Sequence, residues 1–178
     1  EIFQLGYYWE TKILLTAAML TVGIFIFFLT NNFWVQILNA AYLAFVFGQI
    51  GFIAHDTGHR QGFHTVKQND FFGLLHANLF LGMSYGWWVD KHNQHHAQPN
   101  REDMDPDIAI PFIAFTEKAA LEKRGILRFI VKYQKFFFIP LLLFEAYSLH
   151  AGSIRFFIQR KTWKYRWLEI LLFSLHFV

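Results

Sequence analysis

The sequence predicts an all-α membrane protein with about four transmembrane helices in two hairpins and a cytoplasmic helical cap that carries two clusters of histidines. Three observations predict this fold class. Of the 178 residues, 54% are hydrophobic and 20% are aromatic, which is unusual for a soluble protein of this size. The apolar residues gather in long uncharged runs separated by polar stretches. Five of the nine histidines lie in two closely spaced clusters within those polar stretches.

The first hairpin is predicted from two uncharged apolar runs, Ile13–Thr30 and Phe33–Ala54. Each run is close to the roughly 20 residues that a helix needs to span a bilayer. Only Asn31 and Asn32 separate the runs, and so short a break forces the two helices to be antiparallel. The chain after Ala54 therefore returns to the side of the membrane on which Lys12 lies.

The next apolar stretch, Phe71–Val89, is ambiguous because it contains several glycines and the polar residues His76 and Asn78. It is long enough to span, but these residues favour a helix that lies in the membrane interface or re-enters it. Residues 90–128 are polar and charged and are interrupted by prolines, which predicts a water-exposed cap.

The second hairpin is predicted from the last two hydrophobic segments, Phe136–Ile158 and Trp167–Val178. Short cytoplasmic loops are rich in Lys and Arg, as the region 55–135 is, whereas the turn between the first two runs has neither. This difference predicts that the cap faces the cytoplasm. One cluster of basic residues disagrees with a simple two-hairpin arrangement: Arg160, Lys161, Lys164 and Arg166.

Charge and cysteine content exclude several functions. The formal net charge is only +3, and the basic residues are scattered between hydrophobic segments, so no nucleic-acid partner is expected. The chain has no cysteine, which excludes disulfides, thiolate metal sites and cysteine nucleophiles. The histidines are therefore the conspicuous reactive groups.

The two histidine clusters have the spacing of metal ligands on helices. His55 and His59 are four residues apart, and residues with this separation share one helix face. His92, His95 and His96 have the separations i, i+3 and i+4, so their imidazoles also lie on one side of a helix. Transition metals are bound by several converging neutral imidazoles, which helix ends can hold in place. The five histidines are therefore predicted to be metal ligands.

The identity of the metal is also indicated by the pattern. Zinc peptidases use H-E-x-x-H, but here Asp56 follows His55, so this class is disfavoured. Many histidines without cysteine in a membrane protein favour iron that activates oxygen over structural zinc. His176 is also predicted to be a ligand, because an ionisable residue in an apolar segment is costly and is a functional candidate. Three other histidines are predicted to be packed or interfacial: His64, His76 and His150.

Two stretches resemble the first and second histidine boxes of membrane fatty acid desaturases: HDTGHRQ at His55–Gln61 and GWWVDKHNQHHAQPNREDMDPDI at Gly86–Ile108. They are most similar to the branch of bacterial acyl-CoA and acyl-lipid enzymes that includes the front-end desaturases. The resemblance implies a four-span domain with a cytoplasmic cap, a di-iron centre, and oxygen-dependent removal of two hydrogens from an acyl chain. The implied substrate is a fatty acyl-CoA or acyl-lipid, with electrons from a ferredoxin or a b-type cytochrome.

The same resemblance implies iron-ligand roles for His55, His59, His92, His95 and His96, and likens His176 to an additional histidine on the last span of such enzymes. The family's third box, Q-x-x-H-H, is absent because the sequence stops at Val178. Residues 1–178 are therefore interpreted as a single integral membrane desaturase domain truncated at both ends, whose activity as a fragment is open. A fatty acid or alkane hydroxylase of the same superfamily, a transporter and an inactive membrane fragment are the alternatives.

Residues around the boxes have less specific interpretations. Asp56 and Asn93 either orient ligand imidazoles or serve as ordinary polar groups at a helix end or surface. Trp87 and Trp88 are interpreted as interfacial anchors. The acidic residues that follow the second box are interpreted as loop hydrogen-bond acceptors in preference to a docking site for a redox partner: Glu102, Asp103, Asp105 and Asp107.

Overall fold

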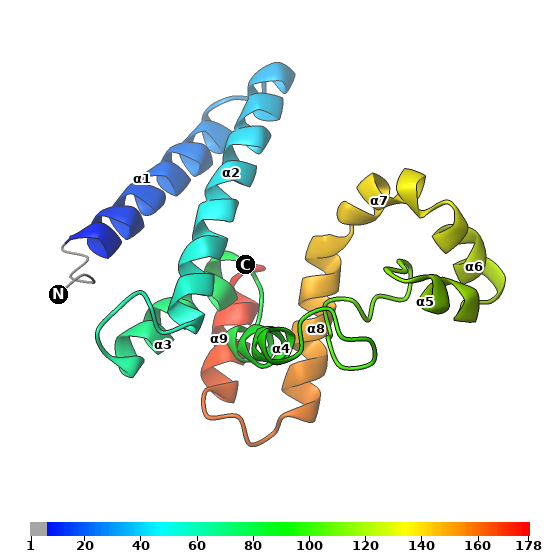
Figure 1. Ribbon diagram of the computed structural model, residues 1–178. Coiled ribbons are helices and arrows are strands. Elements are labelled where there is room, and N and C mark those ends of the chain that lie inside the picture. Colours follow the sequence, from blue (N-terminus) through cyan, green and yellow to red (C-terminus); the bar gives the residue numbers. More distant parts are fainter. Residues whose placement is uncertain (1–6) are drawn as a thin grey trace. The chain divides into compact units, whose positions relative to one another are not determined.

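The computed structural model describes residues 7–178, and all regular structure in that range is helical (Figure 1). The chain divides into two compact units, Glu1–Tyr85 with Tyr165–Val178, and Gly86–Lys164. The helices of the first unit are α1 (Tyr8–Leu29), α2 (Phe33–Gly58), α3 (Val66–Leu74), the π-helix η1 (Leu75–Phe80) and α9 (Arg166–Leu175). The other helices are α4 (Tyr85–Ala97), α5 (Glu117–Glu122), α6 (Gly125–Lys132), α7 (Gln134–Leu142) and α8 (Glu145–Gln159).

The turn between α1 and α2 is closed by side chains that satisfy both helix ends. The Asn32 side chain accepts hydrogen bonds from the backbone amides of Trp34 at 3.0 Å and Val35 at 3.2 Å, which caps the start of α2. The Gln36 side-chain amide donates to the Thr30 carbonyl at 2.6 Å, next to the end of α1. Side chains of the turn therefore pair several of the backbone groups that the two helix ends leave without partners within a helix.

Contacts along α1 and α2 establish that the two helices are antiparallel. The Asn39 amide donates to the Gly23 carbonyl at 3.0 Å, and the Tyr42 hydroxyl donates to the Met19 carbonyl at 2.9 Å. As the residue number rises along α2, the residue number of its partner on α1 falls, which is the pattern of antiparallel helices. The predicted first hairpin is therefore confirmed. A Cβ atom at position 23 would lie 2.4 Å from Leu43 Cδ2, so glycine allows the helices to approach closely here.

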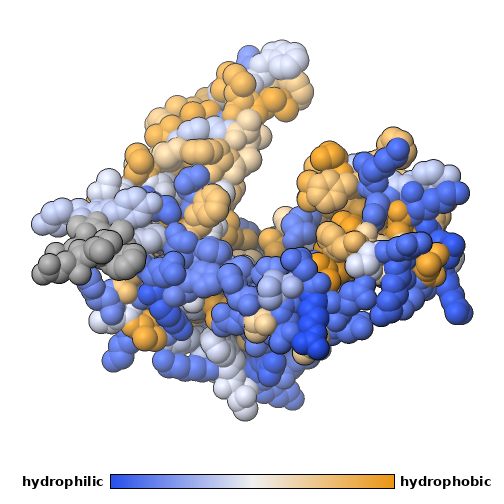
Figure 2. All heavy atoms as spheres, viewed as in Figure 1, coloured by the Kyte–Doolittle hydropathy of each residue, from blue (hydrophilic) through white to orange (hydrophobic). Residues whose placement is uncertain are grey.

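The hairpin has the length and surface of a membrane-spanning element. Its helices have 22 and 26 residues, and both are apolar enough to cross a membrane. At 1.5 Å per residue they are roughly 33 and 39 Å long, against about 30 Å for the hydrocarbon core. Large apolar side chains are exposed along it, including Phe28 at 80% and Leu38 at 72%, and they dominate the surface of the hairpin in Figure 2. The chain is a membrane protein.

The ambiguous apolar stretch Phe71–Val89 forms three short pieces instead of one long helix. Its first part lies in α3 and η1, residues 81–84 are irregular, and α4 begins at Tyr85. The i→i+5 bonding of η1 is seen in the 3.2 Å bond from the Leu81 amide to the His76 carbonyl. His76 is buried and donates from Nδ1 to the Phe72 carbonyl at 2.7 Å, so it is a packed histidine, as predicted.

The second predicted hairpin differs from the first in the described residues. Its first segment is broken into α7 and α8, which are bent by 69°, and the second segment forms only the ten-residue α9. Pro140 lies inside α7 and cannot donate the usual backbone hydrogen bond, and α7 then ends in tighter i→i+3 bonds to the Pro140 and Leu141 carbonyls. By length and composition, two helices within residues 7–178 can span a membrane, or three if the bent pair counts as one span.

Candidate metal centre

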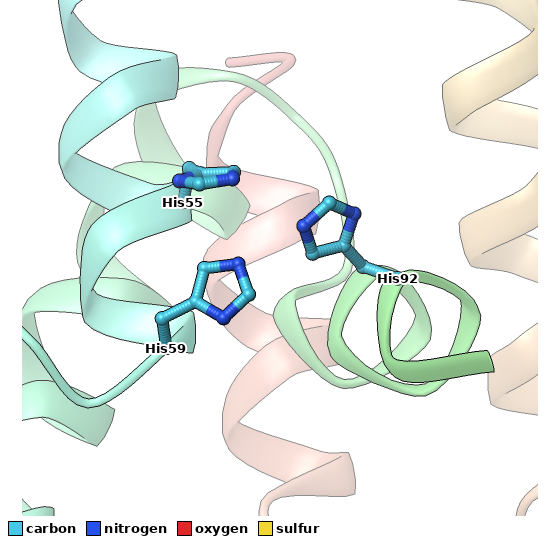
Figure 3. A group of neighbouring side chains, drawn as sticks. All are labelled: His55, His59 and His92. Atoms are coloured by element: carbon cyan, nitrogen blue, oxygen red, sulfur yellow. The ribbon is translucent and has the colours of Figure 1, made fainter. Parts of the chain in front are cut away.

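The first histidine cluster lies at the end of α2, where His55 and His59 project from the same side of the helix (Figure 3). Their ring centroids are 4.6 Å apart, as expected for residues one helical turn apart. His55 Nδ1 is 2.9 Å from Asp56 Oδ1, and Lys12 Nζ is 3.6 Å from the other carboxylate oxygen. An ionised carboxylate only accepts, so Nδ1 carries the hydrogen and Nε2 carries the lone pair that a metal requires.

Helix α2 ends at Gly58, with His59 as its C-cap residue, and the chain then turns away. The Gln61 amide donates to the Asp56 carbonyl at 3.0 Å and the Arg60 amide to the Thr57 carbonyl at 3.0 Å, which together form a Schellman motif. This motif needs a left-handed residue, and Arg60 has a φ of 61°. Such a conformation costs a non-glycine residue about 1–2 kcal/mol. In this conformation the Arg60 side chain contacts Asp70 and Tyr85.

Those contacts form a network behind the first cluster. The Arg60 guanidinium forms an ion pair with Asp70 of α3 and lies 3.2 Å from the Tyr85 hydroxyl. The Tyr85 hydroxyl donates to the Thr57 carbonyl at 3.2 Å, and the Tyr165 hydroxyl donates to Asp70 at 2.8 Å. The network joins the end of α2 to α3 and to the residue that precedes α9. It therefore fixes the helix end on which His55 and His59 are carried.

The second cluster lies on α4, and its three imidazoles are neighbours, as predicted. His92, shown on α4 in Figure 3, has its Nε2 atom 3.0 Å from His96 Nε2. This separation is that of a hydrogen bond between the two rings. The His95 ring centroid is 6.1 Å from that of His92 and 5.7 Å from that of His96. Trp88, predicted to be an interfacial anchor, stacks on His92 with a centroid distance of 4.4 Å.

His95 differs from its two neighbours because a buried carboxylate holds its ring. Its Nδ1 lies 2.9 and 3.0 Å from the two oxygens of Asp105, in the loop between α4 and α5. Burial acts to raise the pKa of Asp105, but hydrogen bonds from the Asp107 and Asn100 backbone amides and from His95 outweigh it and lower the pKa. Asp105 is thus an anionic acceptor at neutral pH. Asn93, for which the sequence left open a role in orienting a ligand imidazole, is exposed on α4.

His176 lies in the first unit, at the end of α9. Its Nδ1 is 2.9 Å from the Leu79 carbonyl of η1, and a carbonyl oxygen can only accept. The hydrogen of the neutral ring is therefore on Nδ1, and the lone pair is on Nε2. The structure places this histidine beside the π-helix, and its predicted role as a ligand remains a prediction.

The residues present suit a transition metal bound by imidazole. Three predicted ligands, His55, His95 and His176, have Nδ1 next to an oxygen acceptor, the arrangement that orients metal-binding histidines in proteins. Nitrogen donors with nearby carboxylates and no thiolate are compatible with iron. Within the second unit, ligand atoms of His95, Asp105 and Asp107 also lie within 4.8 Å of one another.

Comparison with known proteins identifies the family. The sequence profile described as "Fatty acid desaturase" matches residues 32–178, which contain both histidine clusters and His176. The chain belongs to the fatty acid desaturase family. This confirms the resemblance that the two histidine boxes predict.

Desaturases are found among the similar curated proteins. An acyl-lipid (9-3)-desaturase of Physcomitrium patens is 36% identical over 157 residues, covering 84% of this chain and 30% of the relative. A Delta(6)-fatty-acid desaturase of Caenorhabditis elegans is 34% identical, covering 88% and 37%. A Delta 8-(E)-sphingolipid desaturase of Emericella nidulans is 32% identical, covering 85% and 31%. The chain thus spans about a third of the length of these relatives. No solved structure matches it significantly.

Two features of this chain were not singled out in the sequence analysis. Asp105 appeared only as one of four acidic loop residues, although it alone of the four is fully shielded and holds an imidazole. Arg60 lies within the stretch of the first box, but its left-handed conformation has no signal in a sequence without glycine at that position. The D-P-D pattern at 105–107 is the one available sign of a structured turn.

Proposed function

We propose that this chain is part of a longer protein, called the full-length protein below, which is an oxygen-dependent di-iron desaturase that introduces a double bond into a fatty acyl-CoA or acyl-lipid. The observation that carries the proposal is the arrangement of the predicted ligands. His55 and His95 each have Nδ1 against an aspartate carboxylate, and His92 and His96 have their Nε2 atoms 3.0 Å apart. This arrangement occurs in a chain of the fatty acid desaturase family.

The chemistry of the substrate explains why a metal is needed. A methylene in an acyl chain has no acidic proton and no leaving group, so acids, bases and nucleophiles cannot attack it. Iron supplies, when bound, the redox chemistry with dioxygen that such a carbon requires. The residues proposed to hold it are His55, His59, His92, His95, His96 and His176.

The remaining residues of the chain have supporting tasks in this proposal. Asp56 accepts the Nδ1 hydrogen of His55, and Lys12 lies near the same carboxylate and balances its charge. The apolar hairpin of α1 and α2 anchors the first cluster at a membrane surface, where acyl chains are available. Exposed basic side chains such as Arg124, Arg128 and Lys132 suit the docking of an acidic electron donor, either a ferredoxin or a b-type cytochrome.

Metal analysis combined with product analysis tests the function. We expect the purified full-length protein to contain two irons per chain and, with a reductant system and dioxygen, to convert an acyl substrate into a product with one more double bond. Hydroxylated product with the same iron content would instead identify the hydroxylase alternative. Protein that folds but contains zinc or no metal after iron reconstitution would contradict the proposal.

The proposed topology makes a separate prediction, because α1 and α2 form a hairpin and return the chain to one side. The chain has no cysteine, so single cysteines report cleanly on accessibility. Thr65→Cys and Arg101→Cys should both react with an impermeant maleimide from the cytoplasmic face, since both positions are exposed. Asn31→Cys, in the turn of the hairpin, should react from the opposite face. Labelling of Thr65→Cys and Arg101→Cys from opposite faces would contradict a common cytoplasmic location of the two boxes.

A further inference from the structure

The loop after α4 holds a carboxylate against one predicted iron ligand. We infer that Asp105 is a positioning residue for His95, whose hydrogen it fixes on Nδ1 so that Nε2 presents its lone pair to the metal. The metal in this inference rests on the proposed function. The contact itself lies entirely within the second unit, so it can be tested without metal.

Asp105 is held as firmly as a positioning residue must be. Its side chain is fully shielded from solvent. One carboxylate oxygen accepts from the Asn100 amide at 2.7 Å, and the other accepts from the Asp107 amide at 2.8 Å. The Asp105 amide donates to the Arg101 carbonyl at 2.9 Å, which closes the turn. The carboxylate thus has a fixed direction, and His95 Nδ1 approaches both of its oxygens.

A carboxylate in this position has two effects on the imidazole. It can only accept a hydrogen bond, so it stabilises the tautomer with hydrogen on Nδ1. Its negative charge also favours electron donation from Nε2, which strengthens the bond to a metal. The Leu79 carbonyl beside His176 has the first effect without the charge. Asp105 therefore gives His95 support that a backbone oxygen cannot give.

The neighbouring Asp107 does not share this role equally. Asp107 Oδ2 is 3.4 Å from His95 Nδ1, whereas Asp107 Oδ1 is only 2.6 Å from Lys91 Nζ. A metal held jointly by His95, Asp105 and Asp107 is the alternative use of the cluster. This alternative is disfavoured because each Asp105 oxygen already accepts a hydrogen bond from a backbone amide and lies close to His95 Nδ1. A metal there would compete with the bonds that form the turn.

The test uses Asp105→Asn in the full-length protein, with ¹⁵N-labelled histidine and the His95 signals assigned by their loss in His95→Gln. In the metal-free wild type, at a pH where the rings are neutral, NMR should show His95 with hydrogen on Nδ1. In Asp105→Asn the population with hydrogen on Nε2 should rise, because the amide group can donate to Nδ1. Anaerobic titration with Co²⁺ as a probe for ferrous iron should show an affinity about 10- to 100-fold lower.

Glu102→Gln is the matched control, because Glu102 lies in the same loop but contacts Thr116 and Lys118 instead of an imidazole. It should leave both the His95 tautomer and the Co²⁺ affinity unchanged. The inference is overturned if wild-type His95 carries its hydrogen on Nε2, a result that stands even if Asp105→Asn does not fold. It is also overturned if folded Asp105→Asn keeps wild-type tautomer and affinity. Wild-type protein that binds no metal but shows the expected tautomers would contradict the proposed function alone.

Discussion

Replacing His95 with Ala in the full-length protein should abolish desaturation and lower iron affinity by more than about 100-fold, while the protein stays inserted and folded. Loss of a residue that merely orients a ligand costs 10- to 100-fold, and loss of the ligand itself should cost at least as much. Folding should be retained because helix packing and lipid exclusion hold the apolar helices. The measurements are iron content, product formation and the melting temperature in detergent.

His150→Ala is the control for this prediction. His150 lies on α8 and is predicted to be structural or interfacial, so the variant should keep iron and measurable activity. The two variants remove the same side chain and place the same demands on expression and insertion. Substantial activity and iron in His95→Ala would show that the second box has been assigned wrongly.

Replacing Glu169 with Leu should lower the free energy of unfolding by about 2–4 kcal/mol, since each buried hydrogen-bonding group that loses its partner costs about 1–3 kcal/mol. Glu169 is fully buried on α9, and its Oε2 accepts hydrogen bonds from the Ser84 hydroxyl and, at 3.3 Å, from the Asn78 amide. Asn78 in turn accepts from the Tyr85 backbone amide at 3.2 Å. The carboxylate thus joins α9 to η1 and to the start of α4. Denaturant or thermal unfolding in detergent measures the loss.

Two further variants on α9 show whether the loss comes from the acceptor. Glu169→Gln keeps an oxygen that can accept both bonds and should be less destabilising than Glu169→Leu. Ser174→Ala removes an exposed hydroxyl that bonds only within α9, at 2.7 Å to the Ile170 carbonyl, and should change stability by less than about 0.5 kcal/mol. A Glu169→Leu protein as stable as wild type would mean that the buried bonds contribute little.

The first hairpin was predictable because its signal is local. Two uncharged runs and a two-residue polar break are enough to predict two antiparallel helices. The structure adds the contacts that stabilise the hairpin, such as the Asn32 cap and the close approach of the helices at Gly23. The second hairpin was less predictable because hydropathy does not record where a helix bends. The segment Phe136–Ile158 is apolar throughout most of its length, but the structure divides it between α7 and α8.

The sequence by itself determined the family through its two histidine boxes, and the membrane character through its long apolar runs. It also determined the two histidine clusters, because residues three and four apart share a face on any α-helix. Only the tertiary structure decided which oxygens the His95 and His176 imidazoles face. Asp105 reaches His95 because the chain turns back after α4, and the Leu79 carbonyl reaches His176 because α9 packs against η1 across 97 residues of sequence. Helical periodicity specifies neighbours within one helix, whereas these contacts depend on turns and packing that no local pattern encodes.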